Sequence, residues 1–417
     1  MFRKTLLFIA LCLASIVTSA DDLMRDLPFF PIVGHNFLWR ADARIIQDQA
    51  AMGLTLITVN SAEELDWCQQ AGIKGIVWEP RIEYLLNTPD DPQLTARFTD
   101  LARNFKDHPA FAGLALTDEP GKSIMPGYTA AYRAIKAVLP DLPVYTNLFP
   151  SWSQPYQHGF ANYEQYISEF CKLYASLPHP VLTFDNYRNL DHRLSAVERK
   201  ASFLENLDTV SKITAQYNMP FWATVLSAAH DHYPDPSAAD LEFEVFSSLA
   251  YGARGICYFT TVSHQNMIFQ GGPFNMLGDK TPLYTIMREL NYRIRKLAPV
   301  LLTLKSTGVY YSLAASDRIT FRKYPMHKML PGRLIRSVTS DRQNQSFLVG
   351  EFTDDNGDNW VMIVNLDLQK TANFRCEFNG NLQLQHFNSY TGTLYPPQVS
   401  DSWLRPGQGK LYKVIAR

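Results

Sequence analysis

The chain has 417 residues, of which 46% are hydrophobic and 19% are charged. A chain of this length and composition can bury a large core and is long enough for more than one domain. Its 39 basic and 40 acidic residues nearly balance and no basic patch stands out, so the sequence predicts neither nucleic acid nor an anionic surface as a partner.

The first 20 residues have the pattern of a secretory signal peptide. A basic start at Arg3 and Lys4 is followed by an apolar stretch from Leu6 to Val17 and by small residues up to Ala20. The apolar stretch is too short for a membrane-spanning helix, so we predict no transmembrane span. The sequence therefore predicts a secreted or periplasmic protein with a signal peptide over residues 1–20.

Eight apolar runs, each followed by a helix-like stretch, come next along the chain. They are rich in β-branched residues without strict alternation, as strands buried on both faces of a parallel sheet are. The runs are FFPIVGHN (29–36), LTLITVN (54–60), GIKGIVWEP (72–80), AGLALTDEP (112–120), LPVYTNLFP (142–150), VLTFDNY (181–187), PFWATVLSAA (220–229) and GARGICYFTT (252–261). Eight such units over about 250 residues predict a TIM (β/α)8 barrel, here residues 21–305; a doubly wound open sheet is the alternative.

Helical periodicity is clearest over Ala41–Met52, Gln93–Asp107 and Arg199–Tyr217. Asp235 followed by Pro236 predicts another helix start, with the aspartate as the cap and the proline at the first helical position. These helices would connect consecutive strands of the barrel.

The pattern changes after a helix predicted around Leu283–Leu297. From residue 306 on, short β-rich runs alternate with turn signals such as Asn379-Gly380. The runs are SFLVGEF (346–352), NWVMIVNL (359–366), ANFRCEF (372–378), LQLQHF (382–387) and KLYKVI (410–415). We therefore predict a C-terminal antiparallel β-sandwich domain over residues 306–417.

Four cysteines outside the first 20 residues are widely dispersed and lack metal-ligand spacing. They are Cys68, Cys171, Cys257 and Cys376. We expect buried thiols, with one disulfide as the alternative if the protein is exported. The sequence predicts no metal or other cofactor and carries no signal for an oligomeric state.

The segment FAGLALTDEP, residues 111–120, ends a predicted buried strand in two adjacent carboxyl groups and a proline. In a barrel the C-terminal strand ends meet at one rim, where barrel enzymes carry their catalytic groups. Glu119 is the predicted general acid, because the Asp118 carboxylate would oppose its ionisation and raise its pKa. The alternative is that the pair only caps the following helix.

Other polar and aromatic residues fall at the predicted strand ends. Asp185 is a candidate second catalytic group, either as a base or as a ligand of a substrate hydroxyl group. Predicted substrate-binding residues are His35, Asn60, Trp78, Glu79, Asn147, Tyr187, Trp222, His230 and Tyr258. Four aromatic residues could stack on the C–H faces of sugars: Trp39, Trp78, Trp222 and Tyr187. For each of them, packing in the core is the alternative. Such a rim predicts cleavage of O-glycosidic bonds in a carbohydrate substrate.

Two further groups of residues invite a functional reading. His230-Asp231-His232 lacks a third spaced metal ligand, so a sugar-binding or solvated loop is expected there. Glu242 and Glu244 are expected to be helical and either solvated or paired.

Several segments resemble (β/α)8-barrel glycoside hydrolases of the broad superfamily that contains β-galactosidases and related exported proteins. They are LTDEPG (116–121), VYTNLFP (144–150), FDNY (184–187), PFWATVLSAA (220–229) and LAYGARGICYFTT (249–261). The C-terminal run FLVGEFTDDNGDNWVMIVNLD resembles the accessory β-domain of such barrels. The resemblance implies that Glu119 is the acid/base, with Asp118 where the family has an asparagine. The seventh strand offers Ser227 where the family has its nucleophilic glutamate.

A second resemblance is to hexosaminidase families that carry an Asp-Glu pair on the fourth strand. There the glutamate protonates the leaving group and the aspartate orients the substrate's acetamido group, whose oxygen is the nucleophile. Three routes thus stay open for this chain: double displacement, substrate-assisted hydrolysis, and inversion with Asp185 as base. A carbohydrate-binding barrel without catalysis is the alternative from a different class.

Overall fold

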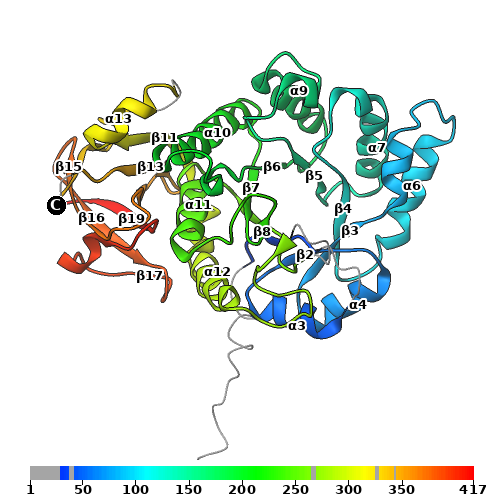
Figure 1. Ribbon diagram of the computed structural model, residues 1–417, viewed down its shortest axis with the longest axis horizontal. Coiled ribbons are helices and arrows are strands. Elements are labelled where there is room, and N and C mark those ends of the chain that lie inside the picture. The colour runs from blue at the N-terminus through cyan, green and yellow to red at the C-terminus, as the bar shows by residue number, and fades with distance from the viewer. Residues whose placement is uncertain (1–28, 37–41, 264–268, 325–327, 342–343) are drawn as a thin grey trace, which may run out of the picture.

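The computed structural model describes residues 29–36, 42–263, 269–324, 328–341 and 344–417, except for the side chains of residues 399 and 400. The predicted signal peptide and Trp39 lie outside these residues. The chain forms a barrel and a β-rich C-terminal part (Figure 1). No helix in the described ranges is both long and apolar enough to cross a membrane.

Eight parallel strands close into a barrel in the order β1-β2-β3-β4-β5-β6-β7-β9. They are β1 (Ile32–Gly34), β2 (Leu56–Val59), β3 (Lys74–Trp78), β4 (Phe111–Asp118), β5 (Val144–Leu148), β6 (Leu182–Asp185), β7 (Phe221–Leu226) and β9 (Gly255–Phe259). Each lies within one of the eight predicted runs, except that β4 begins one residue earlier, at Phe111. Because β1 pairs with both β2 and β9, the sheet is closed, which confirms the barrel and excludes the open sheet.

Helices surround the barrel and connect its strands (Figure 1). They are α3 (Ala43–Ala51), α4 (Ala62–Ala71), α5 (Arg81–Leu86), α6 (Leu94–Phe105), α7 (Met125–Val138), α8 (Pro155–His158), α9 (Tyr163–Ala175), α10 (Ala196–Gln216), α11 (Ala238–Ala250) and α12 (Pro282–Leu301), with the 3-10 turns η1 (Lys122–Ile124) and η2 (Arg188–Leu190). Side-chain caps define several starts: Ser61, Asn162 and Ser195 each accept a backbone N–H of the following turn.

The start of α11 corrects one prediction. Its cap is Ser237, which forms a reciprocal capping box with Asp240, whereas Asp235 was expected to be the cap. Asp235 instead accepts the backbone N–H groups of Ala229 and Gly272. Both aspartate and serine make good caps, and the reciprocal bond from the third helical position favours the serine.

The inside of the barrel is filled by a cluster with members from seven of the eight strands and from Val181, the residue before β6. Its members are Val33, Leu56, Ile76, Ala112, Ala115, Tyr145, Val181, Trp222 and Cys257. A larger apolar cluster lies between the strands and the helices. It combines the outward-facing side chains of the strands with the buried faces of the helices. The inside of the barrel is therefore a packed core that side chains at the rim can reach only from its two ends.

The C-terminal part forms two antiparallel sheets. Its elements are β11 (Lys305–Ser312), α13 (Ala315–Phe321), β12 (Ile335–Ser340), β13 (Phe347–Thr353), β14 (Asn359–Asn365), β15 (Ala372–Phe378), β16 (Leu382–Asn388), β17 (Thr393–Leu394), η3 (Val399–Ser402), β18 (Trp403–Leu404) and β19 (Gly409–Ala416). The sheets have the orders β11-β13-β14-β19-β16-β17 and β12-β15-β18, and their facing side chains form one apolar core. This confirms the predicted β-sandwich. The predicted boundary at residues 305 and 306 falls at the start of β11.

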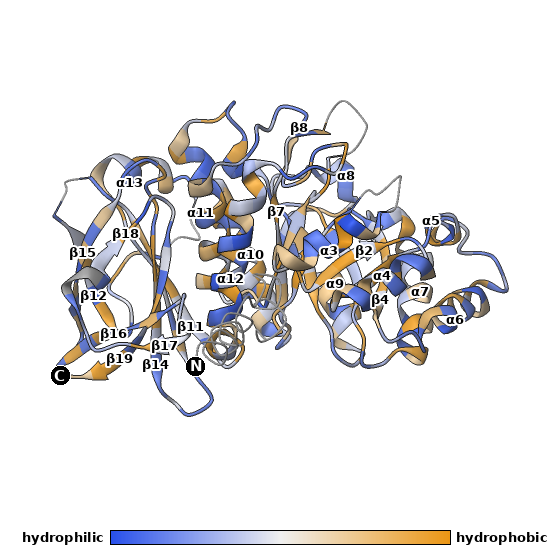
Figure 2. Cartoon of the chain, turned by 90° about the horizontal axis from the view of Figure 1, so that it is seen from below, coloured by the Kyte–Doolittle hydropathy of each residue, from blue (hydrophilic) through white to orange (hydrophobic). Residues whose placement is uncertain are grey.

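The six-stranded sheet packs closely on α11, and α10, α11 and α12 lie between the barrel and the sandwich (Figure 2). At Gly350 an added Cβ would lie 2.3 Å from the carbonyl oxygen of Ala250, and at Gly407 it would lie 2.1 Å from that of Ala239. Glycine thus allows the sandwich backbone to approach α11. The two parts share an extended interface.

Candidate active site

The fourth strand places two carboxyl groups at the C-terminal rim of the barrel. β4 ends at Asp118, and the backbone N–H of Glu119 donates a hydrogen bond of 2.8 Å to the carbonyl oxygen of Asn147 on β5. Glu119 has φ 45°, in the left-handed region, before the chain continues through Pro120. A non-glycine residue there is strained by about 1–3 kcal/mol, and such strain concentrates at functional sites.

Asn147 holds the acidic pair from the neighbouring strand. Its side-chain amide donates a hydrogen bond of 3.0 Å to Oδ1 of Asp118. Its own Oδ1 accepts a hydrogen bond of 3.2 Å from Oγ1 of Thr224 on β7. The asparagine is buried at the rim as predicted, but the contacts it makes are with the carboxyl pair and the barrel wall.

Glu119 has the electrostatic character of a proton donor. Burial raises the pKa of its carboxyl group to about 8, and the charge of Asp118 contributes in the same direction. No hydrogen bond to this carboxyl group comes from the described residues. Glu119 is therefore mostly protonated at neutral pH and free to donate its proton to a bound molecule.

A third carboxyl group lies nearby at the end of β6. Asp185 is 6% exposed, and its buried Oδ1 has no hydrogen-bond partner within the described part of the chain. Burial raises its pKa well above the ordinary value, and the charges of Glu119 and Asp118 add to the rise. The pKa of Asp118 is also raised by burial, but the hydrogen bonds from Asn147 and Glu119 oppose that shift. Negative charges on the three carboxyl groups would repel one another. Because only Asp118 receives hydrogen bonds from both Asn147 and Glu119, it is the member best placed to carry a negative charge.

An aromatic cluster stands beside the carboxyl groups. Tyr187, which follows β6, stacks on Phe259 at the end of β9, with ring centroids 5.7 Å apart and planes inclined by 16°. His230 and Phe269 pair in a small hairpin of β8 (Ala229–His230) and β10 (Phe269–Gln270), and their rings stack at 4.9 Å. His230 also contacts Tyr187 and Phe259 at centroid distances of 6.2 and 5.9 Å. The predicted residues Tyr187 and His230 are thus brought together.

Sequence reasoning missed Phe259 and Phe269 as members of this aromatic cluster. The signal for Phe259 was present, because it directly follows Tyr258 at a strand end and side chains alternate between the two faces of a strand. Phe269 has no comparable signal, since it comes from a short hairpin that was not predicted.

His35 is placed where β1 ends and is uncharged. Its Nε2 lies 2.5 Å from the hydroxyl oxygen of Tyr145, and burial lowers the pKa of its imidazole to about 4. Tyr145 belongs to the cluster inside the barrel. His35 therefore forms part of the floor below the rim.

Two predicted substrate-binding residues lie in the core instead. Tyr258 is wholly buried on the outer face of β9, where its hydroxyl group donates a hydrogen bond of 2.8 Å to Oδ1 of Asn291 on α12. Trp222 is 7% exposed and packs inside the barrel four residues before β7 ends, against Gly255. The predictions were wrong because a strongly apolar strand does not reveal which of its residues face inward or how high they lie in the barrel.

The second and third strands supply three rim residues of different character. Trp78 ends β3 and packs on the cluster inside the barrel. Glu79 is held by Arg81, whose Nε and Nη2 donate hydrogen bonds of 2.8 and 3.0 Å to its two oxygens, and these bonds lower its pKa. Asn60, after β2, is exposed, and its backbone N–H donates to Glu64. Neither Glu79 nor Asn60 touches the three carboxyl groups through a hydrogen bond.

The end of β7 has no carboxyl group. Ser227 stands there, wholly buried, and its hydroxyl group donates a hydrogen bond of 2.9 Å to the carbonyl oxygen of Thr260. The superfamily's nucleophilic glutamate therefore has no counterpart at this position. No set of three His, Cys, Asp or Glu side chains able to hold a metal ion occurs in the described ranges.

The remaining acidic and thiol side chains lie elsewhere. Glu242 is paired with Arg293 and Arg405, as expected for a paired residue. Glu244 is neither solvated nor paired: it is wholly buried, both of its carboxyl oxygens lack a partner within the described part of the chain, and burial raises its pKa well above the ordinary value. The structure thus corrects the expectation for Glu244.

The predicted thiols, Cys68, Cys171, Cys257 and Cys376, are all free.

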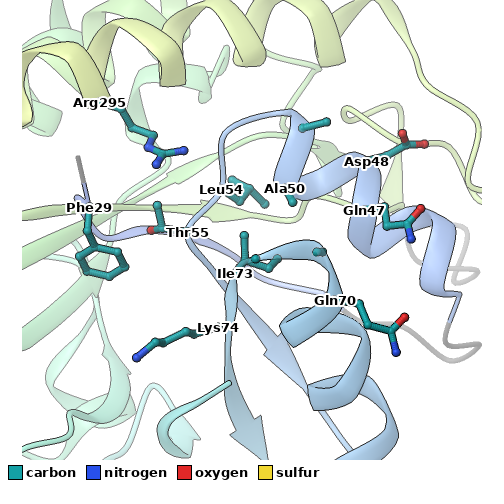
Figure 3. A pocket seen from close by; sticks show the side chains of 13 residues that line it. Phe29, Gln47, Asp48, Ala50, Leu54, Thr55, Gln70, Ile73, Lys74 and Arg295 are labelled. Atoms are coloured by element: carbon teal, nitrogen blue, oxygen red, sulfur yellow. The ribbon is translucent and has the colours of Figure 1, made fainter. Parts of the chain in front are cut away.

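A cavity of about 460 Å³ lies at the N-terminal ends of the barrel strands (Figure 3), whereas Glu119 follows the C-terminal end of β4. Its wall includes Leu54, Thr55 and Lys74, which precede or begin their strands, and Arg295 of α12. Barrel enzymes place their chemistry at the C-terminal strand ends, so this cavity is not the candidate active site.

No protein-family model matches the sequence, and no curated protein is significantly similar to it. Solved structures do share its fold. A β-galactosidase from Bacillus circulans sp. alkalophilus is 10% identical with a TM-score of 0.63, over 93% of this chain and 99% of that one. A GH42 β-galactosidase from G. stearothermophilus is 8% identical with a TM-score of 0.61, over 92% and 98%.

A glycoside hydrolase family 5 protein from Bacteroides vulgatus is 12% identical with a TM-score of 0.53, over 93% of this chain and 89% of that one. The likeness to these structures covers both parts of the chain, at identities too low to carry over an activity. The protein therefore has the (β/α)8 fold of glycoside hydrolases followed by a β-domain, as the resemblance in the sequence implied.

Proposed function

We propose that the protein is an exported glycoside hydrolase that cleaves O-glycosidic bonds of a polysaccharide or glycan. One observation carries the proposal: the strained residue directly after β4, Glu119, presents a carboxyl group with a raised pKa of about 8 and no hydrogen-bond partner in the described structure, next to Asp118. A carboxylic acid kept neutral near pH 7 is the group that glycoside hydrolysis requires at the leaving oxygen. The fold shared with glycoside hydrolases supports this assignment.

In the proposed reaction, Glu119 donates its proton to the glycosidic oxygen as the bond to the anomeric carbon breaks; a water molecule then bonds to the anomeric carbon and returns a proton to Glu119. Asn147 donates a hydrogen bond to Asp118 and so favours its ionised form, which would stabilise positive charge that develops on the sugar. The half-buried rings of His230, Phe259 and Phe269, packed beside the buried Tyr187, offer an apolar surface for a sugar ring near these groups. Each role belongs to a residue at the C-terminal rim.

The buried serine at the end of β7 favours a substrate-assisted variant of this reaction. With Ser227 in the nucleophile position, a 2-acetamido sugar could supply its own carbonyl oxygen to attack the anomeric carbon. Asp118 would orient the acetamido group and Glu119 would protonate the leaving oxygen. Inversion with Asp185 as base is less well supported, because burial and the neighbouring carboxyl groups raise the pKa of Asp185 and so disfavour the ionised form that a base needs.

The test uses paired aryl glycosides that differ only at the sugar C2 position. We expect the wild-type protein to release the aryl group from an N-acetyl-hexosaminide and to act poorly on the matching hexoside. Equal rates on both would exclude substrate assistance while keeping the hydrolase. Sugar binding without turnover of any aryl glycoside would favour the non-catalytic carbohydrate-binding barrel.

Export is a separate part of the proposal. It rests on the basic, apolar and small-residue pattern of residues 1–20. Expression of the full chain with N-terminal sequencing of the product would test it. We expect a mature protein that begins after Ala20 and lies outside the cytoplasm.

A further inference from the structure

A groove of about 970 Å³ lies on the flank of the barrel between α5 and α6. Each helix contributes residues with the spacing i, i+3, i+4, i+7, which places them on one face of that helix. From α5 and the residues that follow it these are Arg81, Tyr84, Leu85 and Thr88, and from α6 they are Arg97, Asp100, Leu101 and Asn104. Two helical faces therefore line one groove.

The groove has an apolar floor and polar walls. Leu85 and Leu101, the third member of each set, are buried at 7% and 5% exposure. Tyr84 is 72% exposed, a large aromatic ring left in contact with solvent. An apolar strip bordered by hydrogen-bonding groups matches a sugar ring, whose C–H faces are apolar and whose edge carries hydroxyl groups.

The charges around the groove are balanced in pairs. Arg81 is paired with Glu79 at 2.8 Å, and Arg97 with Asp91 at 2.9 Å. Asp100, the remaining acid in the wall, lies 3.4 Å from Arg103. A surface of paired charges favours an uncharged polar ligand over a strongly charged one, because neither sign is left in excess.

An ion pair between Arg81 and Glu79 connects the wall of the groove to the rim of the barrel. Arg81 belongs to the groove wall and also binds Glu79, which directly follows the last residue of β3, Trp78. β3 pairs with β4, the strand that leads to Glu119, through Trp78 and Ala115. A chain molecule bound at Glu119 could therefore extend across the end of β3 into the groove.

We propose that this groove binds a remote segment of an uncharged polysaccharide whose glycosidic bond is cleaved at the barrel mouth. This proposal rests on the proposed function, which places the cleaved bond at Glu119, and adds the class of substrate to it. It names the substrate class as polymeric, with Tyr84 stacking on one sugar ring several residues away from the bond that breaks.

The test measures polymer binding in a Glu119→Gln background, so that the polymer is not degraded. The protein is run through native gels that contain soluble β-1,4-galactan, galactomannan, xylan or glycol chitin, and retardation gives the dissociation constant. We expect retardation by at least one polymer, and Tyr84→Ala to raise that constant about tenfold through loss of stacking. Asn104→Trp, which fills the groove, should abolish the Tyr84-dependent part. Trp403→Ala, which removes an exposed ring of the sandwich, is the matched control and should change nothing.

Each other outcome overturns the proposal. Retardation of the Tyr84→Ala and Asn104→Trp variants that is as strong as that of the Glu119→Gln parent would place polymer binding elsewhere, and retardation by none of the polymers would remove the groove as a glycan site. Self-association that is lost in Tyr84→Ala would assign the groove to a second copy of the chain. Turnover of aryl glycosides by the wild-type protein is scored separately, so failure of the hydrolase and failure of the groove are distinguishable.

Discussion

The side-chain amide of Asn147 donates a hydrogen bond of 3.0 Å to Oδ1 of Asp118, and the carbonyl oxygen of the same asparagine accepts the backbone N–H of Glu119. One residue of β5 therefore fixes both members of the acidic pair on β4. Thr224 in turn donates to Oδ1 of Asn147, which sets the orientation of the amide. The contact network reaches across three strands of the barrel.

Glu119→Gln should remove the proton donor while keeping the shape of the side chain. We expect kcat on a susceptible aryl glycoside to fall about 10²–10⁴-fold, the range that general acid catalysis contributes, with sugar binding largely retained. Steady-state kinetics and calorimetric binding measure the two effects. Glu63→Gln, an exposed glutamate in the first turn of α4, is the control and should behave as wild type. Unchanged turnover in Glu119→Gln would take this residue out of the mechanism.

The pH profile should report the raised pKa of Glu119. Because the acid must be protonated to act, kcat/KM should fall as pH rises through about 8. Asp118→Asn removes a negative charge that raises this pKa, so the alkaline limb should move to lower pH. The pKa of Glu119 should still exceed its ordinary value in this variant, because burial is the larger cause of the rise. The position of the limb is the readout, since the maximum rate will also fall; a limb that stays in place or moves upward would contradict the proposed coupling.

Asn147→Ala distinguishes a positioning role from the substrate-binding role that the sequence suggested. If Asn147 positions the pair, its loss should lower kcat by up to about 10²-fold with little change in KM, as expected for a displaced catalytic group. If it contacts the substrate in the ground state, KM should rise instead. Kinetics on one aryl glycoside, with circular dichroism to confirm folding, separates these outcomes.

The strand and helix pattern was enough to predict the barrel, the sandwich and the acidic pair, because long buried runs with regular spacing leave few other folds. Local pattern did not settle which way single side chains face. Tyr258 and Phe259 are neighbours on β9, yet one contacts Asn291 outside the barrel and the other contacts Tyr187 at the rim. The same limit explains Trp222, whose depth depends on the register of all eight strands. The partners of Asn147 come from two other strands, and no spacing within one strand reveals them.

The contact between barrel and sandwich should depend on Glu242. Its carboxyl group pairs with Arg293, which is 1% exposed at the side chain, and with Arg405 of the sandwich at 2.7 Å. Glu242→Ala leaves the Arg293 charge buried without its acidic partner, which should lower the free energy of unfolding by about 3–5 kcal/mol. Arg405→Ala should cost less than about 1 kcal/mol, because this side chain is half exposed. Chemical unfolding of both variants tests the order; equal, small effects would show that the buried pair contributes little.

Gly113→Ala should destabilise the strand that carries the acidic pair. Gly113 lies within β4 at φ 140°, and an added Cβ would lie 2.2 Å from the carbonyl oxygen of Pro143. The backbone conformation at Gly113 is unfavourable for alanine, and the added Cβ would clash with Pro143. The clash can be relieved only if β4 moves away from Pro143, the residue before β5. We expect a loss of at least about 1–3 kcal/mol in the free energy of unfolding. Gly357→Ala is the matched control: φ is 82° and nothing lies within 4 Å of the added Cβ, so it carries only the backbone strain. A larger loss at Gly113 than at Gly357, measured by chemical unfolding, would isolate the close approach to Pro143, and equal losses would exclude it.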